Sequence, residues 1–245
     1  MPSLPAIHST VRALALSSRL AALSVIALLP MLVACAGPRQ DSPSARTGEV
    51  AAAEFSAVDI ETTGFSPKKD RIIEIGVVKL RGTAEVGRTN WLVNPGIPVP
   101  ASAVSVHGIT SEMLKDSPAF AKAVPAFADF IGDSVLLIHN ARFDTAFFGA
   151  ELARAGIPAP TNIVIDTLPV CRKWFANTRR HGLESITEYL GIAVVRRHRA
   201  VDDAGALAAV FAAGLKTQPA AISLADLVAA AGGVYRLDGR KSPQK

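Results

Sequence analysis

Three short runs of apolar and β-branched residues follow one another after residue 50, and turn residues separate them. The runs are 55–61, 71–80 and 89–93, with Gly64-Phe65-Ser66-Pro67 and Arg81-Gly82 between them. Gly and Pro at such positions favour turns, and strands joined by short turns pair with their chain neighbours in an antiparallel manner. The pattern therefore predicts a three-stranded antiparallel meander.

The hydrophobic period changes from two to about 3.6 residues in the second half of the chain. Four segments have apolar positions at helical spacing: 119–131, which contains Pro125, 143–155, 183–190 and 200–215. Two short apolar runs of the kind found in buried strands, 135–138 and 162–165, lie between these helices. The predicted order of elements is βββαβαβαα.

A meander followed by strands that alternate with helices is typical of the α/β class, in which helices cover a sheet. The order predicts a ribonuclease-H-like fold with a mixed five-stranded sheet flanked by helices. We expect the folded domain to cover residues 51–217 and residues 218–245 to form a short C-terminal tail. Within this tail, residues 224–231 are a candidate helix.

Residues 1–50 differ from the rest of the chain. Two arginines precede an uncharged apolar run at 20–34, and a segment rich in Pro, Ser and Arg follows. This order is typical of a signal peptide, and Leu32-Val33-Ala34-Cys35 resembles the lipobox at which bacterial lipoproteins are cleaved and lipidated. Two interpretations stay open. Either the mature protein is a cell-envelope lipoprotein beginning at Cys35, or the start is over-called and a cytoplasmic protein begins near Val50.

Composition narrows the class of protein only moderately. A hydrophobic share of 49% and a charged share of 19% over 245 residues describe a globular protein with one substantial domain. The formal net charge of +5 permits a polyanionic partner without requiring one. The only two cysteines, Cys35 and Cys171, exclude a disulfide framework and a cysteine-ligated zinc site.

Asp59 and Glu61 lie two residues apart in the first predicted strand, so their side chains point to the same face. Neighbouring carboxylates on a sheet repel one another and are costly to desolvate, so such a pair needs compensating partners. Alone, the pair would be a solvated surface feature. Two further carboxylates, Asp144 and Asp203, lie near the starts of predicted helices, where a side chain can reach the edge of the sheet.

Three segments that carry acidic residues and histidine occur in order along the chain. They read VDIETTG at 58–64, HNARFD at 139–144 and HRAVDDA at 198–204. Together they resemble the three motifs of the DEDDh (DnaQ-like) family of 3′-to-5′ exonucleases, which includes the proofreading epsilon subunit of bacterial DNA polymerase III. The resemblance spans about 55–215 and includes three segments between the motifs: 72–76, 106–110 and 166–168.

This resemblance implies that two divalent cations bind to four carboxylates: Asp59, Glu61, Asp144 and Asp203. Hard oxygen ligands without cysteine suit Mg²⁺, with Mn²⁺ as a substitute, better than zinc. The resemblance also implies that His198 acts as the general base beside Asp59 and Glu61, since imidazole exchanges protons near neutral pH. The family pattern His-x-Ala-x-x-Asp-Ala selects Asp203 over Asp202, because alanine follows Asp203.

Six further residues would contact the substrate by the same resemblance: Thr62, Thr63, Val106, His107, Asn140 and Phe143. The threonines would act through backbone or hydroxyl groups, Asn140 would fix the loop that carries Asp144, and Phe143 would offer a ring on which any base can stack. Two assignments have simpler alternatives. Phe143 is equally suited to the core, and His107 to a hydrogen bond with its own loop.

The implied function is hydrolysis of phosphodiester bonds from the 3′ end of single-stranded or frayed DNA, in proofreading, repair or end trimming. An exoribonuclease acting on short RNA has the same motifs, and a non-catalytic nucleic-acid-binding accessory subunit is the alternative of another class. A DNA polymerase subunit is a candidate partner, and a membrane is one only if Cys35 is lipidated. The arginines at 179–180 and at 196, 197 and 199 either contact phosphates or form a solvated surface.

Overall fold

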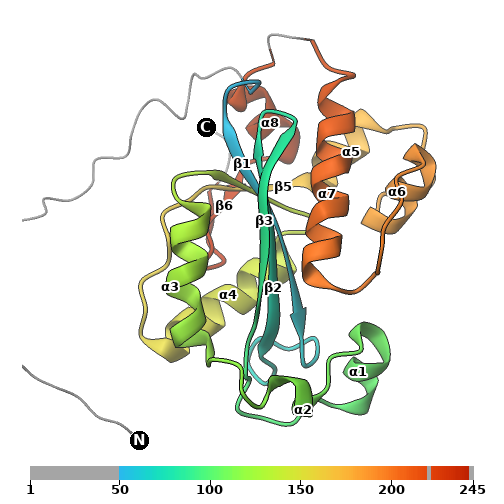
Figure 1. The fold of residues 1–245 in the computed structure, drawn as a ribbon. Coiled ribbons are helices and arrows are strands. Elements are labelled where there is room, and N and C mark those ends of the chain that lie inside the picture. The colour runs from blue at the N-terminus through green and yellow to red at the C-terminus, as the bar shows by residue number, and fades with distance from the viewer. Residues whose placement is uncertain (1–49, 220–221, 243–245) are drawn as a thin grey trace, which may run out of the picture. The chain divides into compact units, whose positions relative to one another are not determined.

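The computed structural model describes residues 50–219 and 222–242 (Figure 1). The predicted leader, including Cys35, lies outside the described residues, so both interpretations of the N-terminus stay predictions. None of the helices in the described part combines the length and the apolar run that crossing a membrane requires.

The first half of the described chain is a meander followed by alternating helices and strands. Its elements are β1 (Glu54–Thr62), β2 (Ile72–Arg81), β3 (Ala84–Leu92), α1 (Ala101–His107), α2 (Ser111–Leu114), α3 (Phe120–Ile131), β4 (Val135–Ile138) and α4 (Arg142–Ala155). The second half is mainly helical. Its elements are β5 (Val164–Asp166), α5 (Thr167–Trp174), α6 (Leu183–Leu190), α7 (Ala200–Leu215), α8 (Leu224–Ala231), β6 (Val234–Tyr235) and β7 (Lys241–Ser242).

All of these strands belong to one mixed sheet with the order β3-β2-β1-β4-β5-β6-β7. The meander β1-β2-β3 is antiparallel, and β1, β4 and β5 run parallel to one another. The α/β class and the ribonuclease-H-like layout predicted from the sequence are confirmed. The prediction of five strands is wrong, because β6 pairs with β5 and β7 pairs with β6. Each added strand has two residues, too few for a hydrophobic period to be visible.

Helices cover both faces of the sheet, with α3 and α4 on one face and α7 with its neighbours on the other (Figure 1). Strand β1 shows how the alternation of its side chains serves both layers. Val58 and Ile60 are buried in the core with α3 and α4, whereas Phe55 and Ala57 are buried in the core with α7. The odd-numbered positions of β1, and with them Asp59 and Glu61, therefore face α7.

The segment expected to be a short tail contributes to both cores. Its predicted helix is confirmed as α8, which begins with a capping box between Ser223 and Asp226 and buries Leu224 and Leu227. Leu237 is fully buried in the core on the other face, with α3 and α4. The described C-terminal residues therefore add a helix and two strands to the same sheet.

Candidate active site

The predicted carboxylates of β1 lie at its C-terminal end, on the face that α7 covers. Burial, followed by the charges of Asp144, Glu61 and Asp203, raises the pKa of Asp59 well above its ordinary value. Burial, followed by Asp203 and Glu74, raises the pKa of Glu61 to about 8. Charges act on a pKa only from nearby, so Asp144 and Asp203, far from β1 in sequence, lie near Asp59 and Glu61 in the fold.

Asp144 enters the site from the first turn of α4, where its side chain is 5% exposed. Burial raises its pKa to about 8. The chain turns from β4 into α4 through Asn140, which has a positive φ of 64° and whose N–H donates to the Asp166 carboxylate at 3.0 Å. Asn140 thus holds the turn that presents Asp144, whereas a contact between Asn140 and substrate stays a prediction.

Asp203 lies in the first turn of α7, and His198 lies just before the helix. His198 is exposed, has a positive φ of 57°, and donates its backbone N–H to Asp203 Oδ2 at 2.8 Å. Ligand atoms of Glu61, His198 and Asp203 all lie within 4.8 Å of one another. Asp202 instead faces Arg196, with 3.5 Å between Oδ2 and Nε. The structure therefore groups Asp203, and not Asp202, with Glu61 and His198, and the role of Asp203 as a metal ligand stays a prediction.

The N-terminus of α7 is bonded to a buried carboxylate in β2, Glu74, which is 0% exposed. Arg199 donates to Glu74 from Nε at 3.0 Å and from Nη2 at 2.8 Å, and the Ala200 N–H donates at 3.1 Å. Asn90 of β3 donates a further hydrogen bond at 2.7 Å. Burial acts to raise the pKa of Glu74, but these donors, Arg199 foremost, lower it below its ordinary value. Arg199 is thus bound within the fold.

Gly76 allows α7 to lie this close to β2. A Cβ at this position would be 2.1 Å from the carbonyl carbon of Ala200, which is far inside van der Waals contact. Gly76 pairs with Asp59 across the strands. The close approach therefore brings the residues around Asp203 directly over the strand that carries Asp59.

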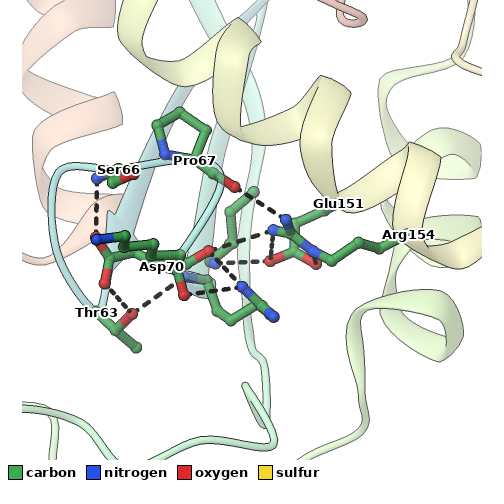
Figure 2. A network of polar contacts seen from close by, with 9 residues as sticks. Thr63, Ser66, Pro67, Asp70, Glu151 and Arg154 are labelled. Carbon is green, nitrogen blue, oxygen red and sulfur yellow. Dashed lines mark hydrogen bonds and ion pairs between the residues drawn. The ribbon is translucent and has the colours of Figure 1, made fainter.

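The loop between β1 and β2 is fixed by a polar network that reaches α4 (Figure 2). Asp70 accepts from the Ser66 N–H at 2.8 Å and from Thr63 Oγ1 at 3.3 Å. Arg154 of α4 donates to the carbonyls of Pro67 and Asp70, and it pairs with the buried Glu151 at 3.0 Å. The loop that follows Glu61 is therefore tied to the helix that carries Asp144.

The predicted substrate contacts lie around this loop but are not equally accessible. Thr63 is buried and its hydroxyl is used within the loop, because it donates to Asp70 and accepts the Arg71 N–H at 3.0 Å. Thr62 is half-buried, and its hydroxyl donates to the Gly64 carbonyl at 2.6 Å. Because the Thr63 hydroxyl is used within the loop, only the backbone groups of Thr63 can contact a substrate.

The other predicted contacts are Val106, His107 and Phe143. Val106 is exposed, whereas His107 is buried and accepts the Ile109 N–H at Nδ1 at 3.0 Å, as the simpler alternative for this histidine expects. Phe143 is half-buried, with its ring centroid 4.9 Å from that of Phe147. Their contacts with substrate stay predictions.

Phe65 is a candidate substrate contact that the sequence pattern alone did not reveal. Its side chain is 90% exposed, and its ring lies edge-on to Phe143 with 6.5 Å between centroids. In the sequence, Phe65 stands inside a Gly-Phe-Ser-Pro turn, and its only signal was an aromatic residue where turns are usually polar. Phe143 directly precedes Asp144 in the chain, and Phe65 lies in the loop that follows Glu61.

The carboxylate cluster fits divalent cations. Four acidic side chains meet, and Arg199, which lowers the pKa of Glu61, is already bonded to Glu74. Carboxylate oxygens with one imidazole form a hard ligand set, and the uncompensated charge favours a cation over a neutral ligand. Cys171, the one cysteine in the described part of the chain, is buried in α5, and burial raises the pKa of its thiol to about 12.

Comparison with known proteins matches this chain both to a protein family and to individual proteins. The Exonuclease family model RNase_T matches residues 56–211. DNA polymerase III PolC-type of Clostridium perfringens is 36% identical over 174 residues, which are 71% of this chain and 12% of that protein. The corresponding protein of Thermotoga maritima is 36% identical over 159 residues, 65% of this chain and 12% of that protein. The chain thus spans about an eighth of the length of these relatives.

Solved structures with this fold include two of nearly the same extent as the matched region. Exonuclease X in complex with 5′ overhanging duplex DNA has a TM-score of 0.57 and 24% identity, covering 71% of this chain and 98% of that one. The nuclease domain of 3′hExo, a DEDDh family member bound to rAMP, has a TM-score of 0.64 and 19% identity, covering 72% and 98%. At these identities the likeness concerns the fold.

Proposed function

Because the chain belongs to the exonuclease family, we propose that it hydrolyses phosphodiester bonds from the 3′ end of single-stranded or frayed DNA and releases 5′-mononucleotides. The observation that carries the proposal is the convergence of four carboxylates from three elements: Asp59, Glu61, Asp144 and Asp203. Each of the four positions holds a carboxylate, which is able to bind a metal.

The cations that suit this site are two Mg²⁺ ions, for which Mn²⁺ can substitute. Oxygen ligands without cysteine support this choice. When bound, such ions would stabilise charge on the attacking and leaving oxygens and would lower the pKa of the attacking water. The chain contributes the fixed positions of the carboxylates, which the anchoring of α7 to Glu74 and of the β1–β2 loop to α4 maintains.

His198 accepts a proton from the attacking water in this proposal. Its imidazole is exposed and lies beside Glu61 and Asp203, so it can exchange the proton with solvent. In this proposal, the 3′ end of the substrate strand packs against Phe143 and Phe65. Val106 and His107, both in α1, are its further contacts. Stacking on aromatic rings tolerates any base, which suits an enzyme that removes nucleotides one after another.

Asp203→Asn and Asp202→Asn, made in the full chain, provide a matched test of this assignment. Both change one carboxylate to an amide in the same helical turn. We expect a 5′-labelled DNA strand to be shortened from its 3′ end in Mg²⁺ by the wild type and by Asp202→Asn, and not by Asp203→Asn or in EDTA. A matched RNA strand tests the exoribonuclease alternative. Binding without shortening in any metal would leave the accessory subunit as the better proposal.

Partner and compartment are separate proposals. We infer association with a DNA polymerase from the PolC-type relatives, of which this chain spans about an eighth. Stoichiometric co-purification with a polymerase supports that partner, and its absence supports a stand-alone role in repair or end trimming. Mass spectrometry of the native N-terminus distinguishes a lipidated Cys35 from a start near Val50.

A further inference from the structure

A cavity of about 520 Å³ lies between the loop 175–182 and helix α6, apart from the carboxylate cluster. Its lining residues are polar or aromatic, and none is acidic: Asn177, Thr178, Arg179, Arg180, Ser185 and Tyr189. We refer to it as the Arg179–Tyr189 cavity. Its chemistry is that of an anion-binding surface with hydrogen-bond donors and one ring.

The acidic residues of α6 and its cavity-lining residues lie on different faces of the helix. Glu184 and Glu188 turn toward Arg197, with ion-pair distances of 3.3 and 3.7 Å. Ser185 and Tyr189, also one helical turn apart, line the cavity instead. Glu184 and Glu188 therefore pair with Arg197 on another face of α6, and they form no ion pair with Arg179 or Arg180, which line the cavity.

The cavity's two arginines are available for a ligand. Within residues 50–219 and 222–242, neither Arg179 nor Arg180 makes a side-chain hydrogen bond or an ion pair, and both are exposed. A second cavity, of about 260 Å³, contrasts with this one. It is lined by Arg71 and Arg154, whose guanidinium groups are already bonded to carbonyls of the β1–β2 loop.

The loop that presents these arginines is held in place. The carbonyl of Phe175, a buried residue, accepts from the Thr178 N–H at 3.0 Å and lies 3.1 Å from His181 Nε2. The His181 carbonyl in turn lies 2.8 Å from Nε2 of His139, the residue that follows β4. Because His139 opens the segment that leads to Asp144, the loop is joined to the active site, and little ordering is needed on binding.

We propose that the Arg179–Tyr189 cavity binds the phosphodiester backbone of the substrate strand on the 5′ side of the nucleotide being removed. The two guanidinium groups contact phosphates, and the half-exposed Tyr189 ring supports a base. This inference rests on the proposed function, since a strand whose 3′ end lies at the carboxylates can reach a second site only with its 5′ portion. The contact is independent of sequence.

The test compares Arg179→Ala/Arg180→Ala with Lys122→Ala/Lys216→Ala, which removes the same charge from exposed positions of α3 and the end of α7. Equilibrium binding of 5′-labelled single strands of about 4 and about 16 nucleotides is measured in EDTA over a salt series. For the long strand, the arginine variant should lower the slope of log affinity against log salt by about 1.4, which is about 0.7 for each of two phosphates.

The short strand should bind the arginine variant as it binds the wild type, and the lysine variant should resemble the wild type with both strands. Arg179→Lys/Arg180→Lys should restore most of the slope, and Tyr189→Ala should weaken long-strand binding about fivefold or more. Equal loss for both strand lengths, or an equal effect of the lysine variant, would overturn the proposal. Because binding is measured without hydrolysis, failure of the cavity and failure of the exonuclease are separate results.

Discussion

Asp144 and Glu61 have the same acidic chemistry as any surface carboxylate, and their surroundings make them different. Burial is the main cause that raises the pKa of each to about 8. A carboxylate must be ionised to bind a metal, so cations and protons compete for these two groups. His198 has the opposite environment, since it is exposed and its backbone, rather than its ring, is bonded to Asp203.

Asp144 is one of the carboxylates that make stability without metal depend on pH. Its pKa rises from 3.8 to about 8 on folding, so the folded state holds the proton more tightly. This contribution to stability is complete below about pH 4 and is lost as the pH rises through about 8. In EDTA, the Tm of Asp144→Asn relative to wild type should therefore increase from pH 4 to pH 8. A difference that stays constant over this range would contradict the assignment.

Replacement of His198 separates proton transfer from metal binding. His198→Ala should reduce kcat about 100-fold or more, the usual effect of losing a general base. Binding of Mn²⁺, followed by calorimetry, should change little, because the carboxylates remain. Equal losses in kcat and metal affinity would mean that His198 is a ligand rather than a base.

Helix α7 positions one of the four carboxylates, and contacts outside the site fix the position of α7 itself. Its first turn holds Asp203, and its N-terminus lies against β2 because Glu74 binds Arg199 and Gly76 has no side chain. A buried carboxylate is costly unless it is paired and hydrogen-bonded, and Glu74 has both kinds of partner. The position of the carboxylate cluster is therefore set by contacts outside it.

Gly76→Ala tests this packing, with Gly87→Ala as the matched control in the neighbouring strand. The new Cβ at position 76 would be 2.1 Å from the α7 backbone, whereas at position 87 it would be 3.5 Å from the Phe130 ring. Overpacking of this kind costs about 1–3 kcal/mol, and in a domain of this size each kcal/mol lowers Tm by about 2–4 °C. Only Gly76→Ala should lower both Tm and kcat. Identical behaviour of the two variants would show that α7 does not depend on this close approach.

At the scale of the whole molecule, residues near the C-terminus extend the sheet and pack on both of its faces. Val50, where the described chain begins, donates its N–H to the Ile222 carbonyl at 3.4 Å, and α8 packs against the same core as β1 and α7. Leu237 fills the core on the opposite face. The C-terminal segment thus covers apolar surface on both sides of the sheet, so the stability of the domain includes it.

A chain ending at Thr217 tests this dependence. Removing Leu224, Leu227 and Leu237 withdraws three buried side chains, each of which stabilises the fold by about 1.5–3 kcal/mol. We expect a large fall in Tm or failure to accumulate as soluble protein, measured beside the full chain. A truncated chain with the Tm of the full chain would show that residues 218–245 are dispensable for the domain.

Local patterns predicted the elements that are long and strongly periodic. The helix at 200–215, the buried strand at 135–138 and the helix at 224–231 have the predicted bounds. β6 and β7 escaped prediction, because two-residue strands are stabilised by pairing with a neighbour and not by a pattern of their own. Phe65 escaped because nothing local distinguishes an exposed ring beside a site from one in an ordinary turn.

The sequence by itself determined the fold class, because hydrophobic period is a property of the linear chain, and its motifs resemble those of an exonuclease family, which supplied the candidate acidic residues. Only the tertiary structure decided what surrounds them. It assigned Arg199 to a buried carboxylate rather than to phosphates, left Arg179 and Arg180 facing a cavity, and raised the pKa of Asp144 to about 8. The charge state of a side chain, and whether it is free to bind a ligand, depend on neighbours in the fold. These neighbours can be more than a hundred residues away in the chain, as Glu74 is from Arg199.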